Sequence, residues 1–261
     1  DDADGHILKT QAQREGIDCS GLVTLAGYRT TFTDAFTSKE TGRRTHIYYP
    51  GTSGLLTPDH FQFEGSRARI LHLGLPGLHE QMDKPWNGDP SGWVAVLKGA
   101  RAAGIKTNLE MCSLPAPRLL EVVAPCLGHL DYLIINDFEV AALSQRPIRH
   151  GEDVDLRDCL ANAKDVFDRS SVELLVVHFP RGAIAMQRGA DPLVIPSVAV
   201  PKEAIAGSNG AGDAIASGIL YGIHQGWRLR DALQLAPSAA AASMRHLGPT
   251  DSIERWQDCL A

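Results

Sequence analysis

The segment that most clearly suggests chemistry is a glycine-rich run, Gly207-Ser208-Asn209-Gly210-Ala211-Gly212-Asp213. It follows an extended run, 193–200, and it opens a predicted helix with one small and apolar face. That face comprises Ala211, Ala214, Ile215, Gly218, Ile219, Gly222 and Ile223. A glycine loop that enters a helix presents backbone N–H groups at the positive end of the helix dipole, which is an anion site. The small face lets the helix pack close to the predicted sheet and so fixes those N–H groups.

Asp213 places a carboxylate in the first turn of this helix, beside the predicted anion site. The helix dipole stabilises a carboxylate there by about 0.3–1 kcal/mol. The carboxylate can also take a proton from a hydroxyl that attacks a phosphorus atom held over the N–H groups. The glycine order is neither that of a Walker A loop nor that of the Rossmann fingerprint. A glycine-loosened helix start with a stabilising Asp fits the same residues, so both interpretations stay open.

A second polar signal, Asn136-Asp137-Phe138-Glu139, joins a predicted strand to a predicted helix. Asn followed three residues later by Glu is typical of a capping box, in which each side chain satisfies a backbone N–H of the other residue. The functional alternative places Glu139 on a magnesium-bound water and Asn136 on a phosphate.

The elements around these residues alternate between apolar strands and amphipathic helices. Strands are predicted at 69–73, 105–111, 132–136 and 173–178, and helices at 93–100, 117–127 and 156–167. This alternation predicts an α/β fold with a parallel sheet between helices. Ligands of such sheets bind outside the carboxyl ends of the strands. The rule nominates Gly74, Glu110, Asn136 and His178, of which Glu110 can contact a ligand or make a structural hydrogen bond.

Before this alternating part, the segments 30–37 and 45–49 read as the two strands of a β-hairpin rich in Thr, Tyr and Phe. Their alternation predicts a small antiparallel sheet, within about residues 22–50, that has one face wet or covers something.

Composition narrows the function further. The 261 residues carry 25 Lys+Arg against 31 Asp+Glu, which argues against a nucleic-acid binder. No apolar run is long enough to span a bilayer, so we expect no membrane association. The five cysteines are scattered, and neither they nor the ten histidines show metal-ligand spacing. They indicate reduced thiols in a cytoplasmic protein.

Taken together, the motifs resemble those of the ribokinase-like (PfkB) carbohydrate kinases. Gly210-Ala211-Gly212-Asp213 resembles the C-terminal signature of that family, and Asn136-x-x-Glu139 is similar to its N-x-x-E motif. The hairpin with its Thr41-Gly42-Arg43 turn resembles the β lid over the sugar. The resemblance implies one domain over 1–261, a three-layer α/β sandwich with a mostly parallel central sheet and a small antiparallel β lid.

The resemblance also implies an activity, the ATP-dependent phosphorylation of a hydroxyl on a sugar or a related small metabolite such as a nucleoside. Asp213 would be the general base, and Gly210, Ala211 and Gly212 would form the anion hole for the γ-phosphoryl group. Asn136 and Glu139 would organise Mg²⁺ through water, and Asn136 and Gly182 would contact the nucleotide. A non-catalytic nucleotide or sugar binder on the same scaffold is the alternative.

Some residues depart from the family pattern. Gly207 and Asn209 stand where Asp and Thr commonly help to bind a monovalent cation, which argues against potassium activation. The nucleotide-side turn, usually glycine-rich, reads His178-Phe179-Pro180-Arg181-Gly182, in which Gly182 can preserve the turn.

Two expectations concern the ends and the assembly of the fold. The residues 1–21 resemble the part that follows the first strand and helix of the family, so we expect the sugar-specificity residues in a segment absent from this sequence. The exposed hairpin predicts a homodimer formed through the lid.

Overall fold

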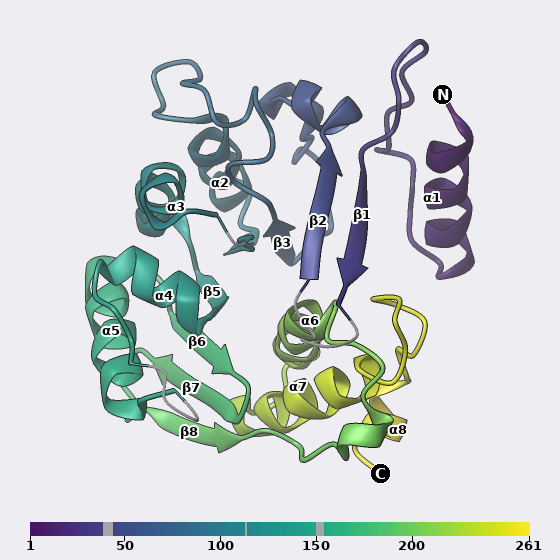
Figure 1. The fold of residues 1–261 in the computed structure, drawn as a ribbon. Coiled ribbons are helices and arrows are strands. Elements are labelled where there is room, and N and C mark those ends of the chain that lie inside the picture. The colour runs from purple at the N-terminus through teal and green to yellow at the C-terminus, as the bar shows by residue number, and fades with distance from the viewer. Residues whose placement is uncertain (39–43, 113, 150–153) are drawn as a thin grey trace.

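A six-stranded sheet forms the centre of the computed structural model, which describes residues 1–38, 44–112, 114–149 and 154–261 (Figure 1). The strand order is β3-β4-β5-β6-β7-β8. The first four strands run parallel: β3 (Ile70–Leu73), β4 (Lys106–Leu109), β5 (Tyr132–Asn136) and β6 (Leu174–Phe179). The last two, β7 (Gly182–Gln187) and β8 (Leu193–Pro196), are antiparallel. The predicted mostly parallel sheet is confirmed, and its antiparallel edge is an addition.

Helices cover both faces of this sheet, and β5 shows why. Its side chains alternate between two cores, because successive residues of a strand point to opposite faces. Leu133 and Ile135 belong to one core, and Tyr132 and Ile134 belong to the other. The first core includes residues of α2 (Gly92–Ala102), α3 (Ala116–Val123), α4 (Asp137–Ser144) and α5 (Leu156–Arg169). The second includes residues of α6 (Ala211–His224) and α7 (Leu229–Ser243). The three-layer α/β sandwich is therefore confirmed.

The small face of α6 packs differently from our expectation. A Cβ on Gly218 would lie 2.8 Å from the Cα of Ala236, and one on Gly222 would lie 2.4 Å from the Cβ of Ala232. Both partners belong to α7, so the glycines allow close helix–helix packing rather than close packing on the sheet. Ile219, which is fully buried, contributes to the core that α6 shares with the sheet.

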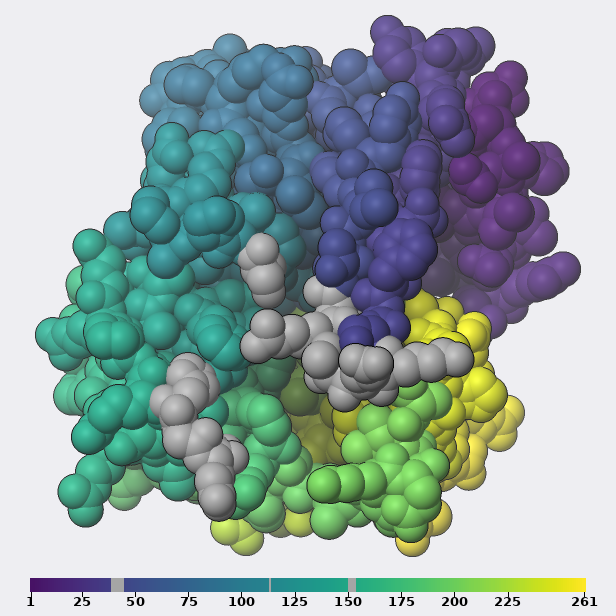
Figure 2. All heavy atoms as spheres, in the orientation of Figure 1, coloured from purple at the N-terminus to yellow at the C-terminus, as the bar shows by residue number. Residues whose placement is uncertain are grey.

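The predicted hairpin is present as a separate two-stranded sheet, β1 (Phe32–Thr37) paired with β2 (Arg44–Tyr49). Figure 1 shows it apart from the central sheet, with helix α1 (Ala3–Arg14) on its other side. In the space-filling view it runs toward the C-terminal segments drawn in green and yellow (Figure 2). The predicted turn Thr41-Gly42-Arg43 lies outside the described residues.

The hairpin has two different faces. The register pairs Phe32 with Tyr49, so these residues share a face with Phe36 and Ile47, and their two rings stack 5.3 Å apart. Tyr48 points to the opposite face, where its hydroxyl donates to the backbone oxygen of Leu78 at 2.9 Å. The base of the hairpin is thus hydrogen-bonded to the segment after β3.

The chain ends are also tied to these elements. Asp2 caps α1 by accepting a hydrogen bond from the N–H of Gly5, and its carboxylate also accepts from the backbone and hydroxyl of Thr30.

Short 3₁₀ turns lie at Gly51–Leu55, Pro58–His60, Ala124–His129 and Lys202–Ala204, and a last helix, α8, spans Trp256–Cys259. Among the residues described, no helix has the length and apolar character to cross a membrane.

Candidate functional site

The carboxyl ends of β4, β5 and β6 bring three of the predicted polar residues to one edge of the sheet. Asn136 ends β5 and pairs in register with His178 of β6. Glu110 directly follows β4, and its N–H donates to the backbone oxygen of Leu73 at 2.8 Å. Gly74 follows β3 and lies against Glu110, because a Cβ on this glycine would be 3.3 Å from the Cβ of Glu110. The edge that the sequence nominated is therefore formed.

Helix α6 begins directly after Gly210, as the sequence predicts. Gly210 is the N-cap residue with a φ of 81°, a left-handed conformation that favours glycine. A Cβ there would lie 2.9 Å from the backbone oxygen of Pro249. The first regular helical hydrogen bond runs from the N–H of Ala214 to the oxygen of Gly210, so the amides of Gly212 and Asp213 lie in the open first turn. These amides have the arrangement that binds anions.

The imidazole of His178 lies beside this helix start. A Cβ on Gly212 would be 3.4 Å from the Cε1 of His178, which shows that β6 and α6 meet at these two residues. Burial lowers the pKa of His178 to about 4, against the opposing charges of Asp137 and Glu110. The ring is therefore neutral near pH 7.

Asp213 occupies the first turn of α6 at the edge of the site, where the residue reaches solvent although its carboxyl is partly buried. Its carboxyl shares a hydrogen bond with Glu110, and this bond, together with burial of the carboxyl and the charge of Glu110, raises the pKa of Asp213 to about 7. Burial raises the pKa of Glu110 as well, but hydrogen bonds with His72 and Asp213 outweigh burial and lower it to about 2. Because the same contact raises the pKa of Asp213 and lowers that of Glu110, a proton shared by the two carboxyls is favoured on Asp213.

Two residues of this site were not found by sequence reasoning. His72 of β3 places its Nε2 2.7 Å from Oε2 of Glu110, and its Nδ1 2.8 Å from Nδ2 of Asn108. Asn108 is fully buried in β4. The available signal is that His72 is the polar residue of the apolar run 70–73, and that Asn108 lies two residues before Glu110, so in an extended chain their side chains point to the same face.

Asn136 and Glu139 form the capping box that the sequence left open as one interpretation. The N–H of Glu139 donates to Oδ1 of Asn136 and the N–H of Asn136 donates to Oε2 of Glu139, both at 2.9 Å. Glu139 is buried, and burial raises its pKa to about 7. Oε1 of Glu139 is the carboxylate oxygen outside this exchange.

The oxygen donors at this edge suit Mg²⁺, which is usually bound through one or two carboxylates together with phosphate oxygens and water. The negative charges of Glu110 and Asp137 further raise the pKa of Glu139, so a divalent cation would relieve their repulsion. Within the described ranges, no group of three or more His, Cys, Asp or Glu residues could hold a metal ion by itself. The fit of this edge to Mg²⁺ rests on its carboxylate oxygens, which would act together with phosphate oxygens and water.

Comparison with known proteins agrees with this geometry. The model of the pfkB family carbohydrate kinases matches residues 1–256. The chain belongs to this family. The bifunctional protein HldE of Magnetococcus marinus is 26% identical over 260 residues, which are 95% of this chain and 48% of that protein. The chain thus spans about half the length of this curated relative.

Solved structures of similar fold include ribokinase from Cryptococcus neoformans in complex with ADP, with a TM-score of 0.76 and 16% identity, covering 98% of this chain and 79% of that one. They also include a nucleoside kinase of Burkholderia thailandensis in complex with inosine, with a TM-score of 0.69 and 17% identity. That match covers 98% of this chain and 76% of the nucleoside kinase. At these identities, the likeness shows that this pfkB family chain shares their fold.

Gly182, which the family resemblance nominated for nucleotide contact, has a structural role. It begins β7, and a Cβ on it would lie 2.2 Å from the backbone oxygen of Ile195 in β8. Only glycine therefore allows these two strands to approach. The preceding Phe179 is buried and ends β6, while Pro180 is exposed in the turn.

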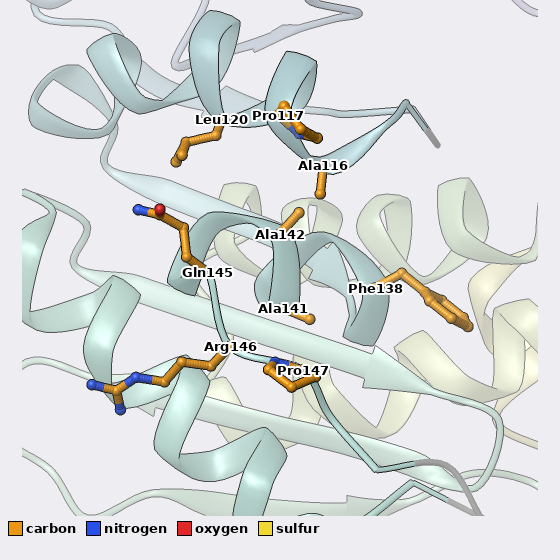
Figure 3. Close-up of a pocket in the computed structure, with 9 residues that line it drawn as sticks. All are labelled: Ala116, Pro117, Leu120, Phe138, Ala141, Ala142, Gln145, Arg146 and Pro147. Atoms are coloured by element: carbon orange, nitrogen blue, oxygen red, sulfur yellow. The ribbon is translucent and has the colours of Figure 1, made fainter.

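Two adjoining hollows of this pfkB family protein are lined by residues of α3 and α4 and not by the start of α6. The first has a volume of about 460 Å³ and is lined mainly by apolar side chains, among them Leu120, Phe138 and Ala142 (Figure 3). The second, of about 450 Å³, also includes Glu139. Neither includes Asp213, so the hollows are separate from the candidate base.

Proposed function

We propose that the protein is an ATP-dependent kinase that phosphorylates a hydroxyl group of a sugar or nucleoside. The observation that carries this proposal is the position of Asp213. Its carboxyl lies in the first turn of α6, next to the open amides of Gly212 and Asp213, with its pKa raised to about 7. A base with a conjugate acid near the working pH is best suited to general-base catalysis.

In the proposed reaction, Asp213 accepts the proton of the substrate hydroxyl as the oxygen attacks the γ-phosphorus. The O–P bond forms while the bond from the γ-phosphorus to the β–γ bridging oxygen breaks, and ADP leaves. The amides of Gly210, Ala211 and Gly212 would donate hydrogen bonds to the transferring phosphoryl group, and the Ala211 amide would first release the oxygen of Ser208, to which it donates at 3.4 Å. Catalysis of this type is mainly positioning and charge stabilisation, and one lost amide donor costs roughly 10²–10³ in kcat.

Asn136 and Glu139 would hold Mg²⁺ through its water molecules. The metal supplies charge neutralisation of the nucleotide phosphates. The capping box holds both side chains at the edge of the sheet and leaves Oε1 of Glu139 outside its two hydrogen bonds, so this oxygen would accept from a metal-bound water. Gly182 would shape the turn on the nucleotide side, and Asn136 would also contact a phosphate.

Other proteins of this fold support the substrate class. One is a ribokinase in complex with ADP and one is a nucleoside kinase in complex with inosine. The ADP complex supports the use of a nucleotide, and the inosine complex and the name ribokinase support a nucleoside or a sugar as the acceptor. We therefore place sugars and nucleosides first among the candidate acceptors.

The hairpin would act as a lid on a single domain and as the contact of a homodimer. Phe36 and Ile47 are each 58% exposed on the face opposite Tyr48. Such an apolar face is suited to burial against a second copy of the chain. A monomeric mass in solution at micromolar concentration would contradict the dimer.

The function is tested by measuring ATP consumption with a panel of sugars and nucleosides, using the unaltered protein and Asp213→Asn in parallel. We expect turnover with at least one acceptor, and loss of that turnover in the variant. If ATP binds and no acceptor is phosphorylated, the non-catalytic binder becomes the better description.

A further inference from the structure

We propose that His72 is a positioning residue for the base: held by Asn108, it donates to Glu110 and thereby keeps the proton shared by Glu110 and Asp213 on Asp213. This inference rests on the proposed function, because Asp213 is its catalytic group. It adds a role for two residues, His72 and Asn108, that lie outside the glycine loop and outside the Asn136–Glu139 cap.

The first step is the orientation of the His72 ring. The amide Nδ2 of Asn108 is a donor, so the Nδ1 of His72 at 2.8 Å accepts its hydrogen. The ring proton then lies on Nε2, which donates to Oε2 of Glu110 at 2.7 Å. Asn108 is fully buried in β4 and its hydrogen bond fixes the orientation of the ring, whereas the side chain of His72 is 40% exposed.

The second step concerns the shared proton. Two carboxyls in hydrogen-bond contact hold one proton between them over a wide pH range. The Nε2–H of His72 makes a stronger hydrogen bond to ionised Glu110 than to its neutral form, so the state with the proton on Asp213 is favoured over its reverse. The low pKa of Glu110 and the raised pKa of Asp213 agree with this division.

The other groups around the pair reinforce the division without replacing His72. Glu139 on α4 adds negative charge that raises the pKa of Asp213, whereas burial keeps His178 on β6 neutral near pH 7, so that it adds no charge. The negative charge of Asp137 on α4 raises the pKa values of Glu139 and His178. Cys112, two residues after Glu110, has a pKa raised to about 11 by burial. Among the described residues, His72 is the residue on a neighbouring strand whose side chain hydrogen-bonds the carboxylate of Glu110.

For catalysis, this arrangement makes Asp213 a stronger base than an isolated aspartate. When Asp213 takes the proton of the substrate hydroxyl, the new O–H donates to the carboxylate of Glu110. The proton then leaves Asp213 for water, to which that side chain is exposed. Glu110 remains ionised throughout.

Carboxyl titration by ¹³C NMR tests the proposal without requiring turnover. In the unaltered protein we expect the Asp213 carbon to titrate near pH 7 and the Glu110 carbon to stay constant from about pH 4 to 9, with Asp213→Asn and Glu110→Gln used for assignment. In His72→Leu, both carbons should titrate in this range, because the proton is then divided between them. In His72→Gln, whose amide N–H can replace Nε2–H, the original pattern should return. A constant Glu110 signal in His72→Leu would overturn the proposal.

Kinetics give an independent readout once an acceptor is known. With an apparent pKa of about 7, kcat/KM at pH 5.5 should be about 3% of its plateau value. In His72→Leu the ratio of kcat/KM at pH 5.5 to that at pH 8.5 should rise several-fold, because part of the singly protonated pairs then carry an ionised Asp213. The exposed His6→Leu serves as the control, with an unchanged ratio. A purely structural role of His72 would lower kcat/KM equally at both pH values and would contradict the proposal.

If no acceptor is ever phosphorylated, the proposed function fails, while the NMR titration still decides whether His72 sets the position of the proton. If turnover occurs and the titration of His72→Leu matches that of the unaltered protein, only the role of His72 fails.

Discussion

Replacing Gly210 by Ala separates the role of the α6 start in catalysis from its role in stability. Gly210 has a φ of 81°, and its added Cβ would lie 2.9 Å from the oxygen of Pro249, well inside ordinary contact distance. The left-handed conformation costs about 1–2 kcal/mol for a residue with a Cβ, and overpacking costs about 1–3 kcal/mol more. We therefore expect the free energy of unfolding to fall by about 2–5 kcal/mol.

A matched control is available at the other end of α6. Gly226 has a φ of 72°, but a Cβ there would meet nothing within 4 Å. Gly226→Ala should therefore lose only the conformational part, about 1–2 kcal/mol, with kcat unchanged. Because Gly210→Ala also displaces the open amides, we expect its kcat to fall by about 10²-fold.

Denaturant unfolding and steady-state kinetics with the acceptor found in the panel are the two assays. Equal kcat in both variants, with the larger stability loss still present in Gly210→Ala, would refute the idea that these amides bind the transferring phosphoryl group.

The remaining predictions concern the metal, pH and helix packing. Glu139→Gln keeps an oxygen for the N–H of Asn136 but removes the charge. The Mg²⁺ concentration for half-maximal activity should therefore rise about tenfold, without loss of thermal stability. An unchanged Mg²⁺ dependence would show that Glu139 does not take part in the metal site. Because the folded protein holds the proton of Asp213 up to about pH 7 and an unfolded Asp releases it near 3.8, stability should fall as the pH rises through this window. Asp213→Asn should therefore become more stable than the unaltered protein between pH 4 and 7, by about 1 kcal/mol after solvent screening, and a difference independent of pH in urea unfolding would contradict this. Gly222→Ala should lower the free energy of unfolding by about 1–3 kcal/mol, because its Cβ would overlap that of Ala232; an unchanged unfolding midpoint would show that α6 and α7 can separate freely.

Much of the fold was predictable because local patterns determine it. The apolar run of β5 and the glycines before α6 have the predicted positions, since a buried strand and a glycine-capped helix leave strong local signals. The pairing of the antiparallel strands β7 and β8 was harder to predict from the sequence, because it depends on the close approach of the two strands at Gly182. The sequence also did not indicate that the glycines of α6 contact α7. The spacing of small residues shows that they share one face of a helix, but it does not show which element packs against that face.

The candidate site was predictable to a similar extent. Asp213 and Asn136–Glu139 carry motifs that are local in the chain. The contact between Glu110 and Asp213 joins β4 to α6, and the hydrogen bond of His72 to Glu110 joins residues 38 positions apart. No periodicity predicts such contacts, because they arise from the order of strands in the sheet.

The most direct test of the central claim is a comparison of Asp213→Ala with the unaltered protein in two measurements, phosphoryl transfer to the acceptor found in the panel and affinity for ATP. If Asp213 is the base, transfer should fall by about 10²–10⁴-fold while ATP binds with nearly the same affinity, because the carboxyl acts on the acceptor and not on the nucleotide. Transfer at the original rate in Asp213→Ala would contradict the account.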